Sequence, residues 1–583
     1  MSYRNYLFRI NSYSLALLLF IILIGCFFRF SNISAKVFWV DEVATAIRVS
    51  GYTIAEVTNE LSALDIFDRN TLISFQTINP SRSLGDSLNA LIQSPEHAPL
   101  YFLLTRFWMQ LWGNSIAIMR SLSVVFSLFT LPSLYWLCQE LFGSSRISWL
   151  AVGIMSISPF YVAYAQEARP YSLWTVAILL AGASFLRAKR LNNRSSWYLY
   201  SFWTIVSLYT SLFSLYVIAF QGLYLLAQVN RKSLAIYKNY LFSTIFSLIA
   251  FSPWILVIIN HIDLLQDNTS WMRGNFNLAD IIAVYIGTNL LIFGDLPLST
   301  ETNPIQIAIA LLAIVIISSI GIKFYPRWQN KKLKLTCLCI ASCLLFIFSK
   351  YIYLDWTTII GALVAIAILS LSIYSIYYLI IKTNKERWLY IICLMLSLPL
   401  PLLITDIINQ GQSSTAPRYL IPLQLGILLA VAFTVTNGLS SSRRKLWQSL
   451  VAIFIIVGIY SNVRNLNISP FYQKGRNINN PAIAKIIDRE QQSLVVVEAP
   501  AAMDAVSLAY SLQPEVKYKI IDRQIDFFSY LNKFKRVFVL KPSLELIENL
   551  KLEPSIELKQ VYKSHVYSAD EFPLDLWQID RKL

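Results

Sequence analysis

Glycine, cysteine and histidine are all scarce in this chain of 583 residues, which contains 18, 6 and 3 of them respectively. The few glycines form no loop of the kind that cradles phosphates, so the sequence offers little support for nucleotide binding. All six cysteines lie within or at the ends of apolar runs, so neither a disulfide framework nor a thiolate metal site is indicated. We find no internal repeat, which argues against a repeat architecture.

Long apolar runs dominate the sequence. The chain is 56% hydrophobic and 14% aromatic, with a mean hydropathy of +0.53. A bilayer core about 30 Å thick takes roughly 20 helical residues per crossing, and the apolar runs reach this length repeatedly. The sequence therefore predicts a polytopic α-helical membrane protein with about 13 transmembrane helices. The expected spans are residues 13–30, 118–138, 147–164, 171–187, 197–210, 213–228, 239–259, 304–322, 335–350, 356–381, 388–404, 418–437 and 447–462.

The net charge of +16 comes mainly from the loops between the expected spans. Clusters of Lys and Arg mark cytoplasmic loops in membrane proteins, and these clusters all fall on the side of the N-terminus, with Arg4 and Arg9. They lie within residues 187–194, 231–238, 323–334, 382–387 and 443–445. We therefore expect a plasma-membrane protein with a cytoplasmic N-terminus. The charge pattern gives topology and is not a nucleic-acid footprint.

This topology divides the chain into a membrane domain, residues 1–462, a linker, residues 463–480, and an extracytoplasmic domain, residues 481–583. Two large external loops are expected at residues 31–117 and 260–303. The first loop includes His97 to Trp112, which we interpret as an amphipathic surface helix because it is short and carries Arg106. In the tail, β-like runs at 494–497, 518–521 and 536–540 alternate with helical stretches, which predicts a small α/β domain with a largely parallel sheet.

Two adjacent acids, Asp41 and Glu42, follow the first apolar run in the sequence Phe38-Trp39-Val40-Asp41-Glu42. A charge at the membrane boundary, among aromatic residues that favour this depth, is costly unless it faces a polar cavity. The pair is therefore a candidate catalytic site. The alternative is a solvated pair of loop acids.

Further polar motifs fall on the same predicted outer face, and their order resembles that of a known family. The motifs are His97-Ala98-Pro99-Leu100-Tyr101, Arg120, Tyr164-Ala165-Gln166-Glu167-Ala168-Arg169-Pro170-Tyr171 and Pro417-Arg418-Tyr419-Leu420-Ile421-Pro422. Together with Asp41 and Glu42, they resemble the protein O-mannosyltransferase and aminoarabinose-transferase group of GT-C glycosyltransferases. The likeness is strong over about the first 260 residues and weaker afterwards.

The resemblance implies a GT-C fold and transfer of a sugar from a polyprenyl-phosphate carrier to an acceptor at the non-cytoplasmic face, with inversion. The expected partners are this donor, membrane lipids, and an acceptor lipid, glycan or protein. Within this scheme Asp41 is the first candidate for the base and Glu42 the second, because a carboxylate can take the proton of an attacking hydroxyl. Arginine suits a phosphate, since it offers a fixed fork of donors. We assign Arg120, Arg418 and Arg169 to the donor phosphate, and His97, Glu167, Tyr171 and Tyr101 to substrate contacts.

No cofactor is required by this chemistry, but some relatives hold a divalent ion in these loops. Glu96 and His97 are the candidate ligands here. The alternative is a histidine that only forms hydrogen bonds.

Two other functions remain open. A transporter or flippase of lipid-linked sugars would show internal pseudo-repeats and broken or charged helices near mid-membrane. A non-catalytic envelope assembly protein would use its external tail to bind partners and would tolerate loss of the Asp41 charge.

Overall fold

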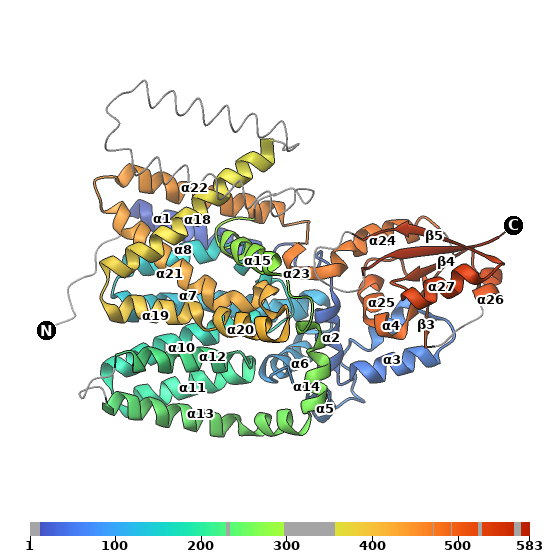
Figure 1. Ribbon diagram of the computed structural model, residues 1–583, viewed down its shortest axis with the longest axis horizontal. Coiled ribbons are helices and arrows are strands. Elements are labelled where there is room, and N and C mark those ends of the chain that lie inside the picture. The colour runs from blue at the N-terminus through green and yellow to red at the C-terminus, as the bar shows by residue number, and fades with distance from the viewer. Residues whose placement is uncertain are drawn as a thin grey trace.

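The computed structural model describes residues 12–228, 234–295, 356–469, 471–490, 492–522, 527–564 and 573–582. A body of long helices lies at one end of the molecule and a smaller α/β unit at the other; α2, α5 and α6 lie between them, whereas α3 and α4 pack on the α/β unit (Figure 1). The expected spans at 304–322 and 335–350, and the basic cluster at 323–334, lie outside the described residues.

The body is built from apolar helices, most of them long. They are α1 (Ser12–Phe30), α7 (Ile116–Phe142), α8 (Ser145–Ile157), α9 (Pro159–Ala165), α10 (Tyr171–Leu191), α11 (Arg194–Thr210), α12 (Ser214–Leu226), α13 (Leu234–Asn260), α18 (Trp356–Lys382), α19 (Lys385–Leu396), α20 (Pro399–Asn409), α21 (Ile421–Leu439) and α22 (Arg444–Arg464). Within the described residues, seven helical segments are long and apolar enough to cross a membrane, or eight with the bent pair α8 and α9. A multi-span helical membrane protein is thus confirmed, and the number 13 stays a prediction.

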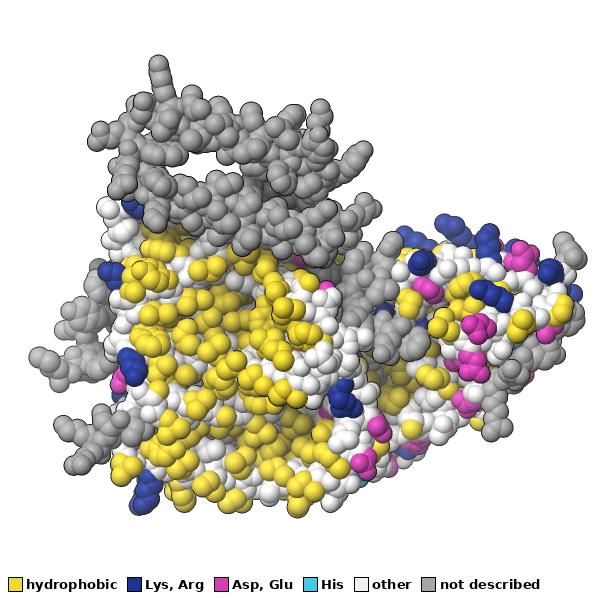
Figure 2. All heavy atoms as spheres, viewed as in Figure 1, with side chains coloured by type: hydrophobic (Ala, Val, Ile, Leu, Met, Phe, Trp, Pro, Cys, Tyr) yellow, Lys and Arg dark blue, Asp and Glu magenta, His cyan; other side chains and the backbone are white. Residues whose placement is uncertain are grey.

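The exterior of this body is apolar. Yellow hydrophobic side chains cover the visible face of the helices, whereas charged side chains gather on the α/β unit and along the rims (Figure 2). On α13, for example, Phe242 and Ile249 are exposed. Apolar surface of this extent on a helical body is what a protein presents to lipid tails.

The bend between α8 and α9 shapes the end of the body where the candidate site lies. The two helices meet at 60°. Pro159 is the first residue of α9, where its missing N–H costs nothing, but continuing α8 through it would lose a hydrogen bond. The short α9 is followed by the turn 166–170, which connects it to α10.

The predicted loop 31–117 is largely helical. It contains α2 (Val40–Ser50), α3 (Ile54–Ala63), β1 (Phe67–Asp68), α4 (Arg69–Ser74), α5 (Leu84–Ile92) and α6 (Leu100–Trp112). The amphipathic helix expected over His97 to Trp112 is present as α6. Its Leu111 and Trp112 are exposed, while Arg106 points inward and donates to the Val49 carbonyl at 2.8 Å and the Ser87 hydroxyl at 2.7 Å.

The described part of the predicted loop 260–303 packs against the segment that follows α20, residues 410–420. The first contains α14 (Ile262–Asn268), η2 (Ser270–Met272) and the apolar α15 (Leu278–Leu291), and the second η4 (Ser413–Thr415) followed by η5 (Pro417–Leu420). The backbone N–H of Gln412 donates to the Met272 carbonyl at 3.0 Å, and the N–H of Phe276 donates to the Gln410 carbonyl at 3.1 Å. These bonds bring Trp271 beside the segment that carries Arg418.

The C-terminal sheet has six strands in the order β1-β3-β2-β4-β6-β5. Its strands are β2 (Ser493–Glu498), β3 (Lys517–Ile521), β4 (Arg536–Leu540), β5 (Ile556–Tyr562), β6 (Leu576–Arg581) and the distant β1; its helices are α23 (Phe471–Lys474), η6 (Gly475–Asn479), α24 (Asn480–Ile487), η7 (Ala499–Ala501), α25 (Ala502–Ala509), α26 (Phe527–Lys533) and α27 (Leu544–Leu552).

The three strands predicted from the sequence are present and parallel to one another, as β3, β2 and β4. The expectation of a largely parallel sheet is wrong for the other half, because β1, β5 and β6 pair antiparallel. The central strands are buried on both faces and therefore read as continuous apolar runs, whereas β5 is half exposed and mixes polar residues in. β1 comes from the first predicted loop, so this sheet joins distant parts of the chain.

Candidate active site

Helix α2 carries both predicted acids in its first turn, at the junction of the helical body and the α/β unit. Asp41 and Glu42 benefit from the positive end of the helix dipole at this position. Consecutive helical residues point about 100° apart, so the two side chains enter different surroundings. The side chain of Asp41 is 27% exposed, whereas that of Glu42 is 0% exposed.

Glu42 is fully engaged inside the protein. Its carboxylate accepts from Arg120 Nε at 2.7 Å and Nη2 at 2.8 Å, from Lys474 Nζ at 2.8 Å, and from the Ala168 backbone N–H at 2.9 Å. Burial opposes ionisation, but the two cations outweigh it and hold the pKa of Glu42 at about 2. Four accepted bonds fill the carboxylate, so in this arrangement Glu42 has no acceptor left for a substrate proton, and its role as second candidate base stays a prediction.

Arg120 has no donor to spare for a phosphate. Besides Glu42, it donates to the backbone carbonyls of Ile33 at 2.7 Å, Lys36 at 3.1 Å and Val37 at 2.9 Å. These bonds use all five of its N–H groups, and its side chain is 0% exposed. In this arrangement Arg120 holds the chain before α2 and pairs with Glu42, so the geometry does not support the predicted phosphate role, which stays a prediction.

Asp41 instead faces two arginines that come from distant segments. Its Oδ2 lies 3.6 Å from Nη2 of Arg169 and 3.9 Å from Nη2 of Arg418. Arg169 is oriented by Nη1, which donates to the Asp41 carbonyl at 3.3 Å and to the Thr45 hydroxyl at 3.1 Å. Among the described residues, the Nε groups of both arginines are buried without a hydrogen-bond partner. The structure thus groups one partly exposed carboxylate with two arginines that have unused donors.

Aromatic rings surround Arg418. Its guanidinium carbon lies 5.6, 5.8 and 5.3 Å from the ring centroids of Trp39, Trp271 and Tyr419. Trp271 belongs to the loop before α15, and Trp39 directly precedes α2. Contacts of this kind orient a guanidinium without using its N–H donors.

Glu167 is the second buried acid of the site. Its Oε1 accepts from the indole N–H of Trp39 at 3.1 Å, whereas Oε2 has no hydrogen-bond partner among the described residues. Burial raises the pKa of Glu167 to about 7, with Lys474 acting in the opposite direction. The residue is 0% exposed, and its predicted substrate contact stays a prediction.

His97 and Glu96 lie beside the site but form an incomplete set for a metal. His97 Nε2 is 3.5 Å from Glu96 Oε1, and Glu96 also accepts from Asn268 at 3.1 Å. Within the described ranges no group of three His, Cys, Asp or Glu side chains approaches a common point. Burial together with Arg48, Arg169 and Arg418 lowers the pKa of His97 well below its usual value. Three nearby cations disfavour a divalent ion, so the residues do not fit one.

The two predicted tyrosine contacts separate in the structure. Tyr101 is fully buried in the packing of α6 on α7, and its hydroxyl pairs with the Ser123 hydroxyl at 2.7 Å; its predicted substrate contact stays a prediction. Tyr171 is the first residue of α10, and the centroid of its ring lies 5.9 Å from the guanidinium carbon of Arg169. Tyr171 therefore remains part of the group around Asp41.

Sequence reasoning missed the residues that support the site from the C-terminal side. Lys474 and Asn477 fall in the predicted linker, residues 463–480, where no site residue is expected. Lys474 is nevertheless 0% exposed against Glu42, and Asn477 Oδ1 accepts the N–H of Val40, the first residue of α2, at 3.1 Å. Trp39 was noted only as a boundary aromatic. No local signal marks Lys474 or Asn477, because their partners are more than 400 positions away.

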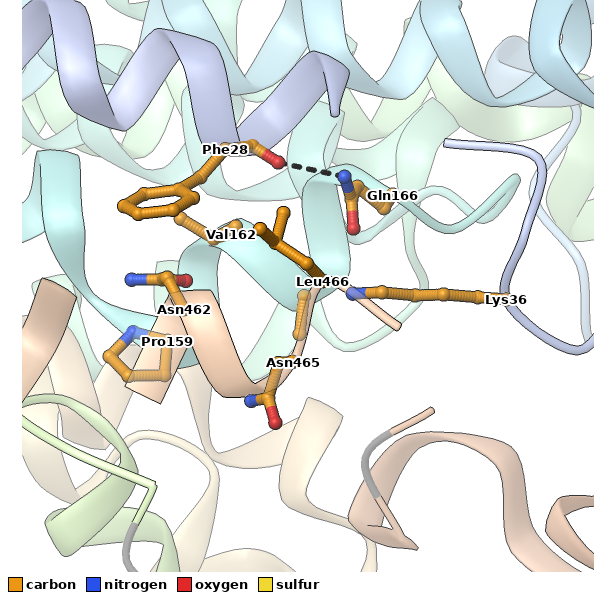
Figure 3. A pocket seen from close by; sticks show the side chains of 9 residues that line it. Phe28, Lys36, Pro159, Val162, Gln166, Asn462, Asn465 and Leu466 are labelled. Atoms are coloured by element: carbon orange, nitrogen blue, oxygen red, sulfur yellow. Dashed lines mark hydrogen bonds between the residues drawn. The ribbon is translucent and has the colours of Figure 1, made fainter. Parts of the chain in front are cut away.

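A small pocket lies beside the turn that carries Gln166 (Figure 3). Its lining residues come from the end of α1, the segment before α2, α9 with the turn that follows it, and the end of α22; they are Phe28, Lys36, Pro159, Val162, Ala163, Gln166, Asn462, Asn465 and Leu466. The amide of Gln166 donates to the Phe28 carbonyl at 2.8 Å, which fixes the turn that precedes Glu167. The pocket thus adjoins the site without containing its carboxylates.

Comparison with known proteins locates the similarity in the first half of the body. Residues 96–257 match the family model of dolichyl-phosphate-mannose-protein mannosyltransferase. No curated protein matches the chain. Two solved structures of ArnT from Cupriavidus metallidurans, in the apo state and bound to undecaprenyl phosphate, are each 14% identical to the chain. Their TM-scores are 0.44 and 0.42; the alignments cover 97% of this chain, and 98% and 97% of theirs.

The matched segment contains the histidine motif, Arg120 and the motif around Glu167 and Arg169, and it ends within α13. The resemblance predicted from these motifs is thereby confirmed over residues 96–257, where the chain is similar to the dolichyl-phosphate-mannose-protein mannosyltransferases.

Proposed function

We propose that this protein is a membrane glycosyltransferase that moves a sugar from a polyprenyl-phosphate donor to a hydroxyl-bearing acceptor. One observation carries the proposal: the partly exposed Asp41 carboxylate stands between Arg169 and Arg418, each with an unused donor. This set supplies a base and an anion-binding pair at a single point. The family match over residues 96–257 supports the same reaction class.

In the proposed reaction the acceptor oxygen attacks the anomeric carbon of the donor sugar. The bond between that carbon and the phosphate oxygen breaks, and the acceptor proton passes to Asp41. Because one displacement occurs without a covalent enzyme intermediate, the configuration at the anomeric carbon inverts. A positioned carboxylate contributes about 10²- to 10⁴-fold to such a step.

The polyprenyl phosphate leaves as an anion and needs charge stabilisation rather than a proton. Arg169 and Arg418 offer N–H groups next to Asp41, and an N–H bonded to a phosphate forms a charge-assisted hydrogen bond. The approach of Asp41 to both arginines keeps them in place before the donor arrives, and the phosphate would replace the weak contacts at 3.6 and 3.9 Å. Arg120, by contrast, takes no part in donor binding.

We place the reaction on the non-cytoplasmic face. Arg120 and Glu140 both lie on α7, about 30 Å apart at 1.5 Å per residue, which is the thickness of a bilayer core. Glu140 pairs with Arg190 at 2.7 Å, and Lys189 pairs with Glu386 at 3.3 Å, so two basic clusters meet at the end of the body opposite Arg120. The excess of Lys and Arg assigns that opposite end to the cytoplasm.

The test is transfer by purified protein in lipid nanodiscs, using a panel of radiolabelled polyprenyl-phosphate hexoses and pentoses with envelope extract as acceptor. Asp41→Asn should lower the rate by about 10³-fold while the protein remains folded. Glu60→Gln is the matched control, because Glu60 is an exposed acid of the same predicted loop. Analysis of lipid-linked sugars in cells with and without the protein then identifies donor and product.

An Asp41→Asn protein that retains the wild-type rate would remove the base assignment. Export of intact donor without cleavage of its sugar-phosphate bond would instead favour a flippase.

A further inference from the structure

Residues 36–40, which lead into α2, are held from two sides: Arg120 donates to the Lys36 and Val37 carbonyls, and the C-terminal part of the chain bonds the same stretch. The Val37 N–H donates to the Ser469 hydroxyl at 3.0 Å, and the Val40 N–H donates to Asn477 Oδ1 at 3.1 Å. The Ser507 hydroxyl donates to the Phe38 carbonyl at 2.7 Å. Each of these bonds satisfies a backbone group that has no partner within its own helix.

Lys474 is the centre of this arrangement. Its ammonium is fully buried, donates to Glu42 at 2.8 Å and lies 6.0 Å from the centroid of the Trp39 ring. The neighbouring Gln473 donates to the Ala163 carbonyl at 2.6 Å, which ties the same segment to α9. Lys474 therefore contacts the turn that carries Asp41. It also lies near Trp39, whose indole N–H donates to Glu167.

The far side of this segment is anchored in the α/β unit. Arg476 Nε and Asn477 Nδ2 donate to Asp504 at 2.8 and 3.1 Å, and Lys541 at the end of β4 donates to the same carboxylate at 3.2 Å. Asp504 lies in α25 and is buried. We call Ser469 and residues 473–477 the clasp, since they connect the α/β unit to the first turn of α2.

We propose that Lys474 is a positioning residue through which the C-terminal unit holds Asp41 in its reactive orientation and maintains the charge balance between Glu42 and Glu167. This inference rests on the proposed function and deepens it. Displacement of a reacting group by about 1 Å can cost on the order of 10²-fold in rate. A cation that fixes the first turn of α2 therefore acts on turnover without touching the substrate.

The balance of charges makes the role specific to a cation. Glu42 faces Arg120 and Lys474, so the buried cluster contains one ionised acid and two cations, with Glu167 nearby. Lys474 is the largest single influence that opposes the upward shift of the Glu167 pKa. Replacing it with an apolar residue of similar length removes that opposition, so Glu167 should titrate at higher pH.

The experiment compares Lys474→Met, Lys474→Arg and Lys559→Met in the nanodisc transfer assay, full chain in each case. Lys474→Met should lower kcat by about 10- to 100-fold with the donor KM changed less than about twofold, because it disturbs orientation and not donor contacts. Its pH profile should move to higher pH, and Lys474→Arg should recover most of the rate. Lys559, an exposed lysine of β5, is the matched control and should behave as wild type.

Asn477→Ala provides a second variant should Lys474→Met fail to fold. It removes the bond to the Val40 N–H and one of the bonds to Asp504, but Asp504 keeps Arg476 and Lys541, and Glu42 keeps both of its cations. It should lower kcat without the pH shift. The clasp is refuted if folded Lys474→Met keeps the wild-type kcat and pH profile, or if Asn477→Ala keeps the wild-type kcat. Failure of the proposed function is separate, because it would appear as an active Asp41→Asn protein whatever the clasp variants do.

Discussion

Asp41 and Glu42 are neighbours in the first turn of α2, but their surroundings differ. The Glu42 carboxylate is buried with all its acceptors filled, whereas the Asp41 carboxylate is partly exposed. Around Glu42 every acceptor is filled and both cations are committed, so the carboxylate stabilises structure. Around Asp41 the arginines stand at 3.6 and 3.9 Å with unused donors, so the group can accept a ligand. Saturation, rather than the type of residue, separates a structural charge from a reactive one.

The comparison is tested most strongly by the stability of the two isosteric amide variants. Glu42→Gln leaves Arg120 and Lys474 buried with a neutral partner, and breaking a buried pair costs about 3–5 kcal/mol of the free energy of unfolding. Asp41→Asn should change that free energy by less than about 0.5 kcal/mol. Thermal unfolding in detergent measures both, and equal destabilisation by the two variants would contradict the division.

Arg418 and Arg120 should differ in the same way: substitution of Arg418 should affect donor binding, and substitution of Arg120 should affect stability. Arg418→Lys keeps the charge but loses the planar fork and the aromatic contacts, so the donor KM should rise about 10- to 100-fold with little loss of stability. Arg120→Lys should instead reduce the unfolding temperature, because three backbone carbonyls lose donors. A normal donor KM in a folded Arg418→Lys protein would remove the phosphate assignment.

The pH dependence of the donor KM should report the ionisation of Glu167. Below about pH 7 its carboxyl is neutral, and above it a third negative charge appears close to the anion-binding arginines, so the donor KM should increase as the pH rises through about 7. In Glu167→Gln this increase should disappear. The folded pKa is raised above the ordinary 4.5, so the contribution of Glu167 to stability falls between about pH 4.5 and 7 and stays constant above.

The smallest expected effect concerns Tyr101, which lies next to the histidine motif but inside the helix packing. Tyr101→Phe removes one hydroxyl and leaves Ser123 without that partner, so the free energy of unfolding should fall by about 1 kcal/mol. Neither kcat nor the donor KM should change. An altered KM would return Tyr101 to the substrate contacts.

Asp41, Arg169, Arg418 and Tyr171 were predicted together from the sequence, and the structure groups them. Arg120 and Glu42 were predicted with them and instead pair with each other inside the protein. The sequence could not separate the two groups, because a charge at the end of a span has the same local signature whether its partner is a phosphate or another side chain. Similarly, the apolar strands β2 to β4 were readable, but β1 became a strand only through its pairing with β3.

The sequence by itself determined the membrane class, the long helices and the gathering of acids and arginines at one end, because apolar length and charge are properties of local composition. Only the tertiary structure decided that the Glu42 carboxylate is buried and fully hydrogen-bonded while the Asp41 carboxylate is partly exposed. It also decided that Lys474, more than 400 positions away in the sequence, contacts the first turn of α2. The physical reason is that hydrogen-bond saturation and burial depend on which distant groups meet, and no local pattern encodes those partners.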